Sequence, residues 1–78
     1  MENNQFTLEE AFLLINKIVL ERDRVHIGGK EVASLGTVVG LLTMNDEIEL
    51  VVKFSTRLSQ LNKEEFSQQI EAVTDDQA

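Results

Sequence analysis

The stretch from Thr37 to Phe54 constrains the fold more than any other part of the chain. It reads TVVGLLTMNDEIELVVKF and places alternating apolar residues on both sides of the pair Asn45-Asp46. Asn and Asp both tolerate the positive φ angles that a two-residue type I′ turn requires. The stretch therefore predicts a β-hairpin whose tip is Asn45-Asp46.

A turn at this position sets the register of the hairpin, because side chains alternate between the two faces of a strand. One face would then carry apolar or β-branched cross-strand pairs, namely Thr43/Ile48, Leu41/Leu50, Val39/Val52 and Thr37/Phe54. A slip of one residue would place Glu47, Glu49 and Lys53 among these groups. The pattern itself therefore favours this register.

The second face of the hairpin is mixed in character. Its residues are our candidate partner-binding set: Val38, Leu42, Met44, Glu47, Glu49, Val51 and Lys53. A sheet face turned to water is normally more polar than this, and a buried face does not carry three charges. An apolar centre with a charged margin is typical of a protein–protein contact.

Two accounts of this second face stay open at the level of the sequence. In one, a C-terminal helix folds back and covers it with Phe66, Ile70 and Val73. In the other, a second copy of the chain or a foreign partner covers it.

A helix is predicted near the N-terminus. Residues 7–10 read TLEE and match a capping box, in which the Thr7 hydroxyl and the Glu10 carboxylate each accept a backbone N–H of the other residue. Apolar residues then recur at helical spacing, at Leu8, Ala11, Phe12, Ile15, Ile18 and Val19. We expect a helix that continues to the break in the pattern at Glu21 and packs this stripe on the sheet.

A short hairpin is predicted next, with Gly28-Gly29 as its turn. It would place Val25 opposite Val32 and His26 opposite Glu31.

Two glycines mark the passage into the central hairpin. Ser34-Leu35-Gly36 reads as the connection, in which Gly36 is free to adopt a positive φ angle. Gly40 lies inside a strand, where glycine indicates a bulge, a bend or a close approach of another backbone.

Residues 35–54 resemble the strand-turn-strand of an SH3-like small barrel, such as a KOW-type domain. The likeness rests on one glycine and alternating valines and covers about a quarter of the chain, so no function is carried over from it.

The C-terminal third predicts a second helix. Asn62 is placed to cap it with Glu65 at the third helical position, and the apolar residues Leu61 and Phe66 are placed as a hydrophobic staple. The helix is expected to reach about Val73, with Phe66, Ile70 and Val73 as a narrow stripe. Residues 55–60 stay open between strand, loop and helical turn.

Together these elements predict an α+β fold: an antiparallel sheet of three to four strands, built from two hairpins and flanked by an N-terminal helix and a short C-terminal helix. The 78 residues form one small domain, with residues 1–5 and 74–78 expected to be disordered.

Reactive chemistry is sparse in this sequence. There is one His and no Cys, which excludes the common zinc sites, and Asp46, Glu47 and Glu49 lack the ligand pattern of an EF-hand loop. No Ser lies in a GxSxG elbow. We therefore expect no enzymatic activity, no metal and no cofactor.

The charge balance narrows the choice of partner. Seven basic and fourteen acidic residues give a net charge of −7, which repels phosphate backbones and anionic membranes. With no Cys, no secretory leader and no run long enough to span a membrane, we expect a cytoplasmic protein without membrane contact.

The function that fits these features is that of a small acidic interaction or regulatory protein, acting on a partner protein or on a second copy of itself. The alternative is a nucleic-acid-binding small-barrel module that uses the basic stretch 22–30, with Arg22, Arg24, His26 and Lys30. No Tyr or Trp is present to stack bases beside these charges, which makes nucleic acid the less favoured partner.

Overall fold

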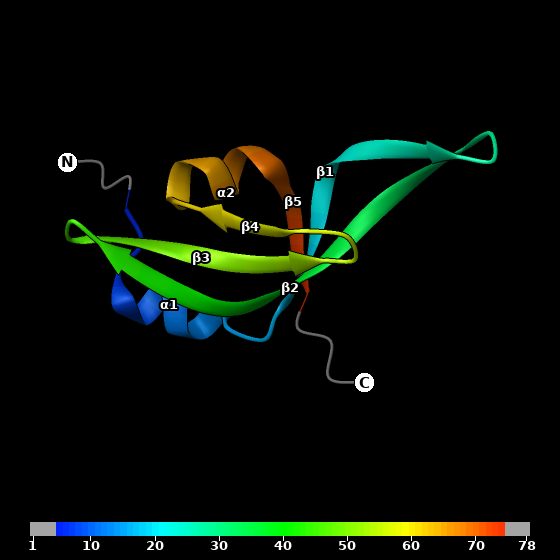
Figure 1. The fold of residues 1–78 in the computed structure, drawn as a ribbon. Helices are drawn as coiled ribbons and strands as arrows, with labels where there is room; N and C mark the ends of the chain where they lie inside the picture. Colours follow the sequence, from blue (N-terminus) through cyan, green and yellow to red (C-terminus); the bar gives the residue numbers. More distant parts are fainter. Residues whose placement is uncertain (1–4, 75–78) are drawn as a thin grey trace.

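A five-stranded antiparallel sheet is the frame of the protein in the computed structural model, which describes residues 5–74 (Figure 1). The elements along the chain are α1 (Leu8–Leu14), β1 (Ile18–Ile27), β2 (Lys30–Met44), β3 (Glu47–Phe54), β4 (Leu58–Leu61), α2 (Lys63–Gln69) and β5 (Ile70–Thr74). The strand order is β4-β3-β2-β1-β5. The predicted α+β class is confirmed, and the sheet has five strands where we expected three to four.

Helix α2 connects the two edge strands of this sheet, because β4 precedes it and β5 follows it. Every element contributes to one buried core, formed by Phe6, Ala11, Val19, Val38, Leu50, Val52, Phe54, Leu61, Phe66 and Ile70. The two helices meet at this core: the rings of Phe6 and Phe66 lie edge to face at 5.7 Å, and Lys63 Nζ lies 3.2 Å from a carboxylate oxygen of Glu10. The sheet is therefore closed on its inner side by both helices.

The tip of the central hairpin is confirmed. Asn45 and Asp46 have φ angles of 52° and 66°, as a turn of the predicted kind requires. The predicted register also holds from Met44 opposite Glu47 down to Gly40 opposite Val51.

Below Gly40 the predicted register is wrong, because a bulge at Val39 interrupts the ladder. Val38, not Val39, lies opposite Val52, and Phe54 lies opposite Gly36. An extra residue in one strand reverses the alternation of every side chain beyond it. Val38 is accordingly fully buried, whereas Val39 is 47% exposed. A bulge beside Gly40 is one of the three roles predicted for that glycine.

The predicted connection at Ser34-Leu35-Gly36 is wrong, because these residues lie inside the long strand β2. Gly36 does not adopt a positive φ angle. It is required for another reason: a Cβ atom there would lie 2.8 Å from two ring carbons of Phe54. The glycine therefore makes room for the Phe54 ring in the core.

The capping box of α1 is confirmed, since the Glu10 N–H donates to the Thr7 hydroxyl at 3.1 Å and the Thr7 N–H donates to Glu10 Oε1 at 2.9 Å. The predicted length of the helix is wrong. It ends at Leu14, and Asn16 takes a left-handed φ of 70° that helices commonly use to terminate.

Residues 18–20 start strand β1 instead of continuing the helical stripe. Ile18 and Val19 are β-branched and fit a strand as well as an apolar helix face. Here Val19 lies opposite Gly36 on β2 and Val73 on β5, so both neighbours supply backbone partners. The shortened helix turns Ala11 to the core and leaves Phe12 62% exposed.

The start of α2 is confirmed and its end is not. Asn62 Oδ1 accepts the Glu65 N–H at 2.8 Å, and Glu65 Oε1 accepts the Asn62 N–H at 2.9 Å. The helix ends at Gln69 rather than near Val73, because residues 70–74 pair with β1 as strand β5.

Residues 55–60, left open by the sequence, contain a loop and the start of β4, which pairs with β3. Thr74 belongs to β5 and is not part of a tail. Apart from Gln5 and Thr74, the residues predicted to be disordered lie outside the described range.

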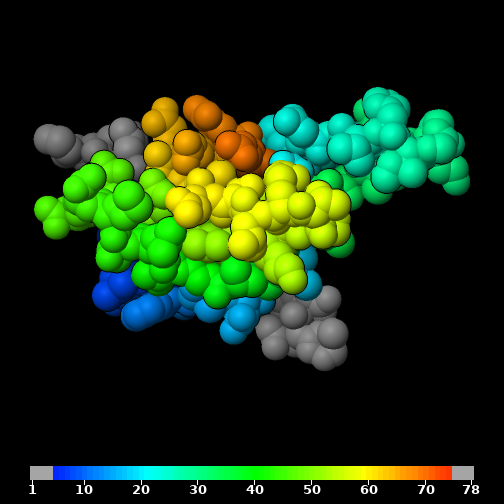
Figure 2. All heavy atoms as spheres, in the orientation of Figure 1, coloured from blue at the N-terminus to red at the C-terminus, as the bar shows by residue number. Residues whose placement is uncertain are grey.

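The first hairpin is confirmed in turn and register, with φ angles of 58° at Gly28 and 79° at Gly29 and with Val25 opposite Val32. It is longer than predicted and extends away from the rest of the molecule (Figures 1 and 2). Strand β1 pairs with β5 only as far as Glu21, and β2 pairs with β3 only from Gly36 onward. We call the part beyond these points, residues 22–35, the ribbon.

Candidate protein-binding surface

The side of β2 and β3 that faces away from the core carries six of the seven candidate residues, and we call it the outer face: Leu42, Met44, Glu47, Glu49, Val51 and Lys53. Val38 is not part of it, because the bulge at Val39 turns Val38 into the core. Its inclusion in the candidate set is corrected accordingly.

Cross-strand pairing brings these residues together. Met44 lies opposite Glu47 and Leu42 lies opposite Glu49, so each exposed apolar side chain of β2 has a carboxylate as its neighbour on β3. Met44 is 56% exposed and Leu42 is 37% exposed. The tight turn at Asn45-Asp46 holds these pairs in place, because a two-residue turn leaves no freedom to slip.

The described part of the C-terminal segment, residues 62–74, does not cover the outer face. Phe66 and Ile70 are buried in the same core as Leu50, on the inner side of the sheet. Val73 lies on β5 and is 42% exposed. The account in which a C-terminal helix covers this face is therefore wrong, because α2 joins the two edges of the sheet and must turn its apolar side chains inward.

The outer face is acidic. It carries three carboxylates, at Asp46 in the turn and at Glu47 and Glu49 on β3, and one cation, Lys53, on the same strand. Strand β4 extends the face sideways, since Leu58 lies opposite Lys53 and is 66% exposed. The sequence prediction missed Leu58 because residues 55–60 carry no clear periodicity. The pattern of β3 alone would not reveal which strand lies beside it.

Helix α1 adds exposed apolar side chains elsewhere on the surface. Leu8, Phe12 and Leu13 are 50%, 62% and 72% exposed. The predicted stripe placed Leu8 and Phe12 against the sheet, but the helix is only seven residues long and turns Ala11 to the core. Leucine and phenylalanine within a helix do not by themselves show which side is covered.

The basic stretch predicted for the alternative function has internal roles. Arg22 donates to the carbonyl oxygens of Gln68 at 3.1 Å, Ser67 at 3.3 Å and Ile70 at 3.2 Å, at the end of α2 and the start of β5. Carbonyl groups at a helix C-terminus lack intrahelical partners, so a guanidinium is well suited to bind them. Arg22 therefore fastens the base of the ribbon to α2.

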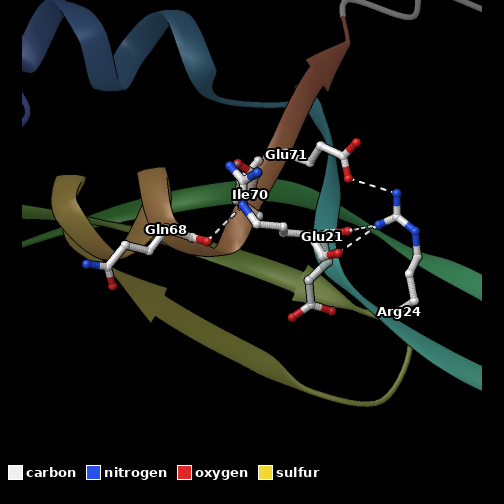
Figure 3. Close-up of polar contacts among 6 residues, drawn as sticks. Glu21, Arg24, Gln68, Ile70 and Glu71 are labelled. Carbon is white, nitrogen blue, oxygen red and sulfur yellow. Dashed lines mark hydrogen bonds and ion pairs between the residues drawn. The ribbon is translucent and has the colours of Figure 1, made fainter.

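Arg24, two residues further along the same strand, makes a second set of contacts. Its Nη1 donates to the carbonyl oxygens of Glu21 and Arg22 at 2.8 and 2.9 Å, and its Nη2 lies 2.8 Å from Glu71 Oε1 (Figure 3). In Figure 3 the pair of Arg24 with Glu71 joins β1 to β5, and the contact with the Glu21 carbonyl lies within β1. His26 lies opposite Glu31 as predicted, and both are exposed near the tip of the ribbon.

Within residues 5–74, no group of three or more His, Cys, Asp or Glu side chains is arranged to hold a metal ion. None of the helices in that range combines the length and the apolar character needed to cross a membrane. Comparison with protein families, with curated proteins and with solved structures found no match to this chain.

Proposed function

We propose that this chain is a small, acidic, non-enzymatic interaction or regulatory protein that binds a partner protein through its outer face. The observation that carries the proposal is that Leu42 and Met44 remain exposed beside Glu47 and Glu49, while both helices turn their buried side chains to the opposite side of the sheet. Exposed apolar groups with charges at their margin are the features of an interface core and its rim.

The chemistry of the face defines the partner. Leu42, Met44 and Val51 would supply apolar burial, and the carboxylates of Glu47 and Glu49 would select Lys or Arg side chains on the other protein. The net charge of −7 adds a long-range attraction for a basic partner. In keeping with a chain that has no Cys, we place this interaction in the cytoplasm.

Nucleic acid is the weaker candidate. Arg22 and Arg24 donate to acceptors within the protein, so binding phosphates would require them to leave those contacts. Loss of these contacts would also weaken the attachment of the ribbon to α2 and β5. A mobility-shift assay at low salt tests this class directly: the proposal expects no retardation of DNA or RNA.

The test of the outer face is a pair of Leu→Glu variants. Leu42→Glu places a charge in the centre of the face, whereas Leu13→Glu makes the same change at an exposed position on α1. We expect both variants to melt as the parent does. We expect a protein captured from lysate by the parent and by Leu13→Glu to be lost from Leu42→Glu, and its capture to weaken with added salt.

Two results would contradict the proposal. Leu42→Glu could bind the same proteins as the parent, which would exclude the outer face as the site. It could instead unfold, which would show that Leu42 acts in stability rather than in binding.

A further inference from the structure

The ribbon, residues 22–35, is the part of the molecule with the least support from its surroundings. Among residues 5–74 its two strands pair only with each other, since β5 pairs with β1 no further than Glu21 and β3 pairs with β2 only from Gly36 onward. A two-stranded ribbon is marginally stable in water, and a free strand edge presents a row of N–H and C=O groups to other chains. The ribbon therefore has the geometry to accept a further strand.

Four apolar side chains of the ribbon are exposed, alongside the charged ones. Val25, Ile27, Val32 and Leu35 are 43%, 64%, 40% and 59% exposed. With Ala33 and Ser34 and with residues 55–57 of the β3–β4 loop, they line a groove. The loop lies beside the ribbon in Figure 2, and the groove borders the edge of β2 that β3 leaves unpaired.

The wall of this groove is held in place. The Phe54 N–H donates to the Arg57 carbonyl oxygen at 2.8 Å, which closes the loop on itself. The Arg57 guanidinium lies over the Phe54 ring, 4.1 Å from its centre, and forms an ion pair with Glu21. The groove is therefore formed before anything occupies it.

We infer that the occupant is a second copy of this chain, and that the unpaired edges of two β2 strands associate in antiparallel fashion about a two-fold axis. The result is a continuous four-stranded sheet in the order β1-β2-β2-β1. This surface is separate from the outer face, and the inference does not depend on the function proposed for that face.

Charge favours self-association at the ribbon over the rest of the surface. The ribbon contains two acidic side chains, Asp23 and Glu31, and three basic ones, Arg22, Arg24 and Lys30, so its net charge is +1 and the remaining residues carry −8. Two copies that meet through any acidic part repel each other. The ribbon also projects from the body, which keeps the acidic bodies apart (Figure 1).

The edge of β2 is better suited to pairing than the edge of β1. Strand β1 has a bulge between Leu20 and Arg24, and the Arg22 carbonyl oxygen in that region already accepts from Arg24. Bulges and charged side chains are devices that keep an edge strand from pairing. Strand β2 has no register shift between Lys30 and Ala33, and residues 32–35 are uncharged.

The symmetry selects one register. A two-fold axis perpendicular to the sheet places one residue opposite its own copy. With Glu31 at the axis, two carboxylates would meet. With Ala33 at the axis, Lys30 of one copy would have to pair with Gly36 of the other, and Gly36 already pairs with Phe54.

Val32 at the axis meets neither obstacle. Each Val32 then lies opposite its copy, Glu31 lies opposite Ala33, and Lys30 lies opposite Ser34. By the same count Gly28 of one copy comes level with Gly36 of the other, but Gly28 belongs to the turn and needs no ladder partner there, whereas Lys30 is a strand residue.

A single-cysteine pair of variants tests this register, because the chain has no Cys of its own. Directly opposed residues of antiparallel strands have Cα atoms about 4.5–5.5 Å apart, within the range that a disulfide spans. Val32→Cys should therefore convert to a disulfide-linked dimer under mild oxidation. Val25→Cys is the matched control: it is equally exposed on the neighbouring strand, but its copy would lie roughly 14 Å away, three strand spacings across the sheet.

The expected result is a dimer band for Val32→Cys and a monomer for Val25→Cys, with light scattering of the parent showing a mass that rises with concentration to that of a dimer. Equal cross-linking of both variants, or a parent that stays monomeric at millimolar concentration, would overturn the inference. The double variant Val32→Cys/Leu42→Glu separates the two proposals: it should still cross-link even if the outer face binds nothing.

Discussion

The two hairpins of this protein begin from the same local geometry and reach opposite environments. Both turn through two residues with positive φ, at Gly28-Gly29 and at Asn45-Asp46. In the central hairpin Leu50 and Val52 are fully buried. In the ribbon Ile27 is 64% exposed.

The difference shows that a turn specifies a hairpin but not its burial. The same strand, β2, takes part in both hairpins, and its character changes at Gly36, where β3 begins to pair with it. From Gly36 to Met44 a core lies on one face of the strand. From Lys30 to Leu35 the strand has β1 as its only neighbour among the described residues. Apolar residues are present in both halves, so their environment is decided by what packs against them.

The largest expected effect comes from placing the same charge in each hairpin. Val52→Asp buries an unpaired carboxylate at a fully buried position, which exceeds what a marginally stable domain can absorb, so we expect an unfolded chain. Val32→Asp changes a position that is 40% exposed and should shift the free energy of unfolding by only about 0.5 kcal/mol. Circular dichroism and thermal melts of dilute samples compare them. Similar melting of both variants would remove the contrast between core and ribbon.

The next effect tests the junction between the hairpins. Gly36→Ala places a Cβ atom 2.8 Å from the Phe54 ring and should cost about 1–3 kcal/mol through overpacking. Gly40→Ala is the control, because a Cβ atom there would have no atom of the described residues within 4 Å. Urea unfolding measures both free energies. If the two variants were equally stable, the close approach at Gly36 would not be what shapes the core.

A smaller effect tests how the ribbon is joined to the body. Arg22→Ala removes three hydrogen bonds to carbonyl oxygens of α2 and β5 and should cost about 1 kcal/mol, because the contacts are largely exposed. In the Arg22→Ala variant, hydrogen exchange should show faster opening of residues 67–70 than of the core strands. Lys30→Ala, near the tip of the ribbon, serves as the control and should leave both quantities unchanged.

The smallest effect concerns the contact between the helices. The hydrogen bond from the Thr7 backbone, followed by Lys63, lowers the pKa of Glu10 below its usual value. A carboxylate with a lowered folded-state pKa contributes stability above its unfolded pKa, and that contribution disappears as the pH falls through the folded-state pKa. The parent should therefore melt above Glu10→Gln at neutral pH, and the gap should close in acid.

Glu9→Gln is the control for this experiment, since Glu9 lies in the same first turn and takes no part in the capping box. A gap between the parent and Glu10→Gln that persists unchanged at low pH would show that the carboxylate charge is not what stabilises this end of the molecule.

Features that depend on a few neighbouring residues were predictable from the sequence. Both capping boxes, the two turns and the pairing next to each turn follow from side chains within four positions of one another. Of the candidate binding set, the residues near the Asn45-Asp46 turn lie where the pattern predicted, because the turn alone sets their register. Val38 lies beyond the bulge, and its burial could not be read from alternation.

What the sequence by itself determined is therefore where the chain turns and where its helices begin; their ends were decided by the tertiary structure. Residues 18–20 and 70–74 have apolar spacing that suits a helix or a strand, and they become strands because they pair with each other across about fifty positions of the chain. Hydrogen bonds between segments so far apart leave no local pattern, because each segment gains them only when the sheet brings its partner alongside. The same long-range pairing sends α2 to the inner side of the sheet, and so leaves the outer face and the ribbon exposed.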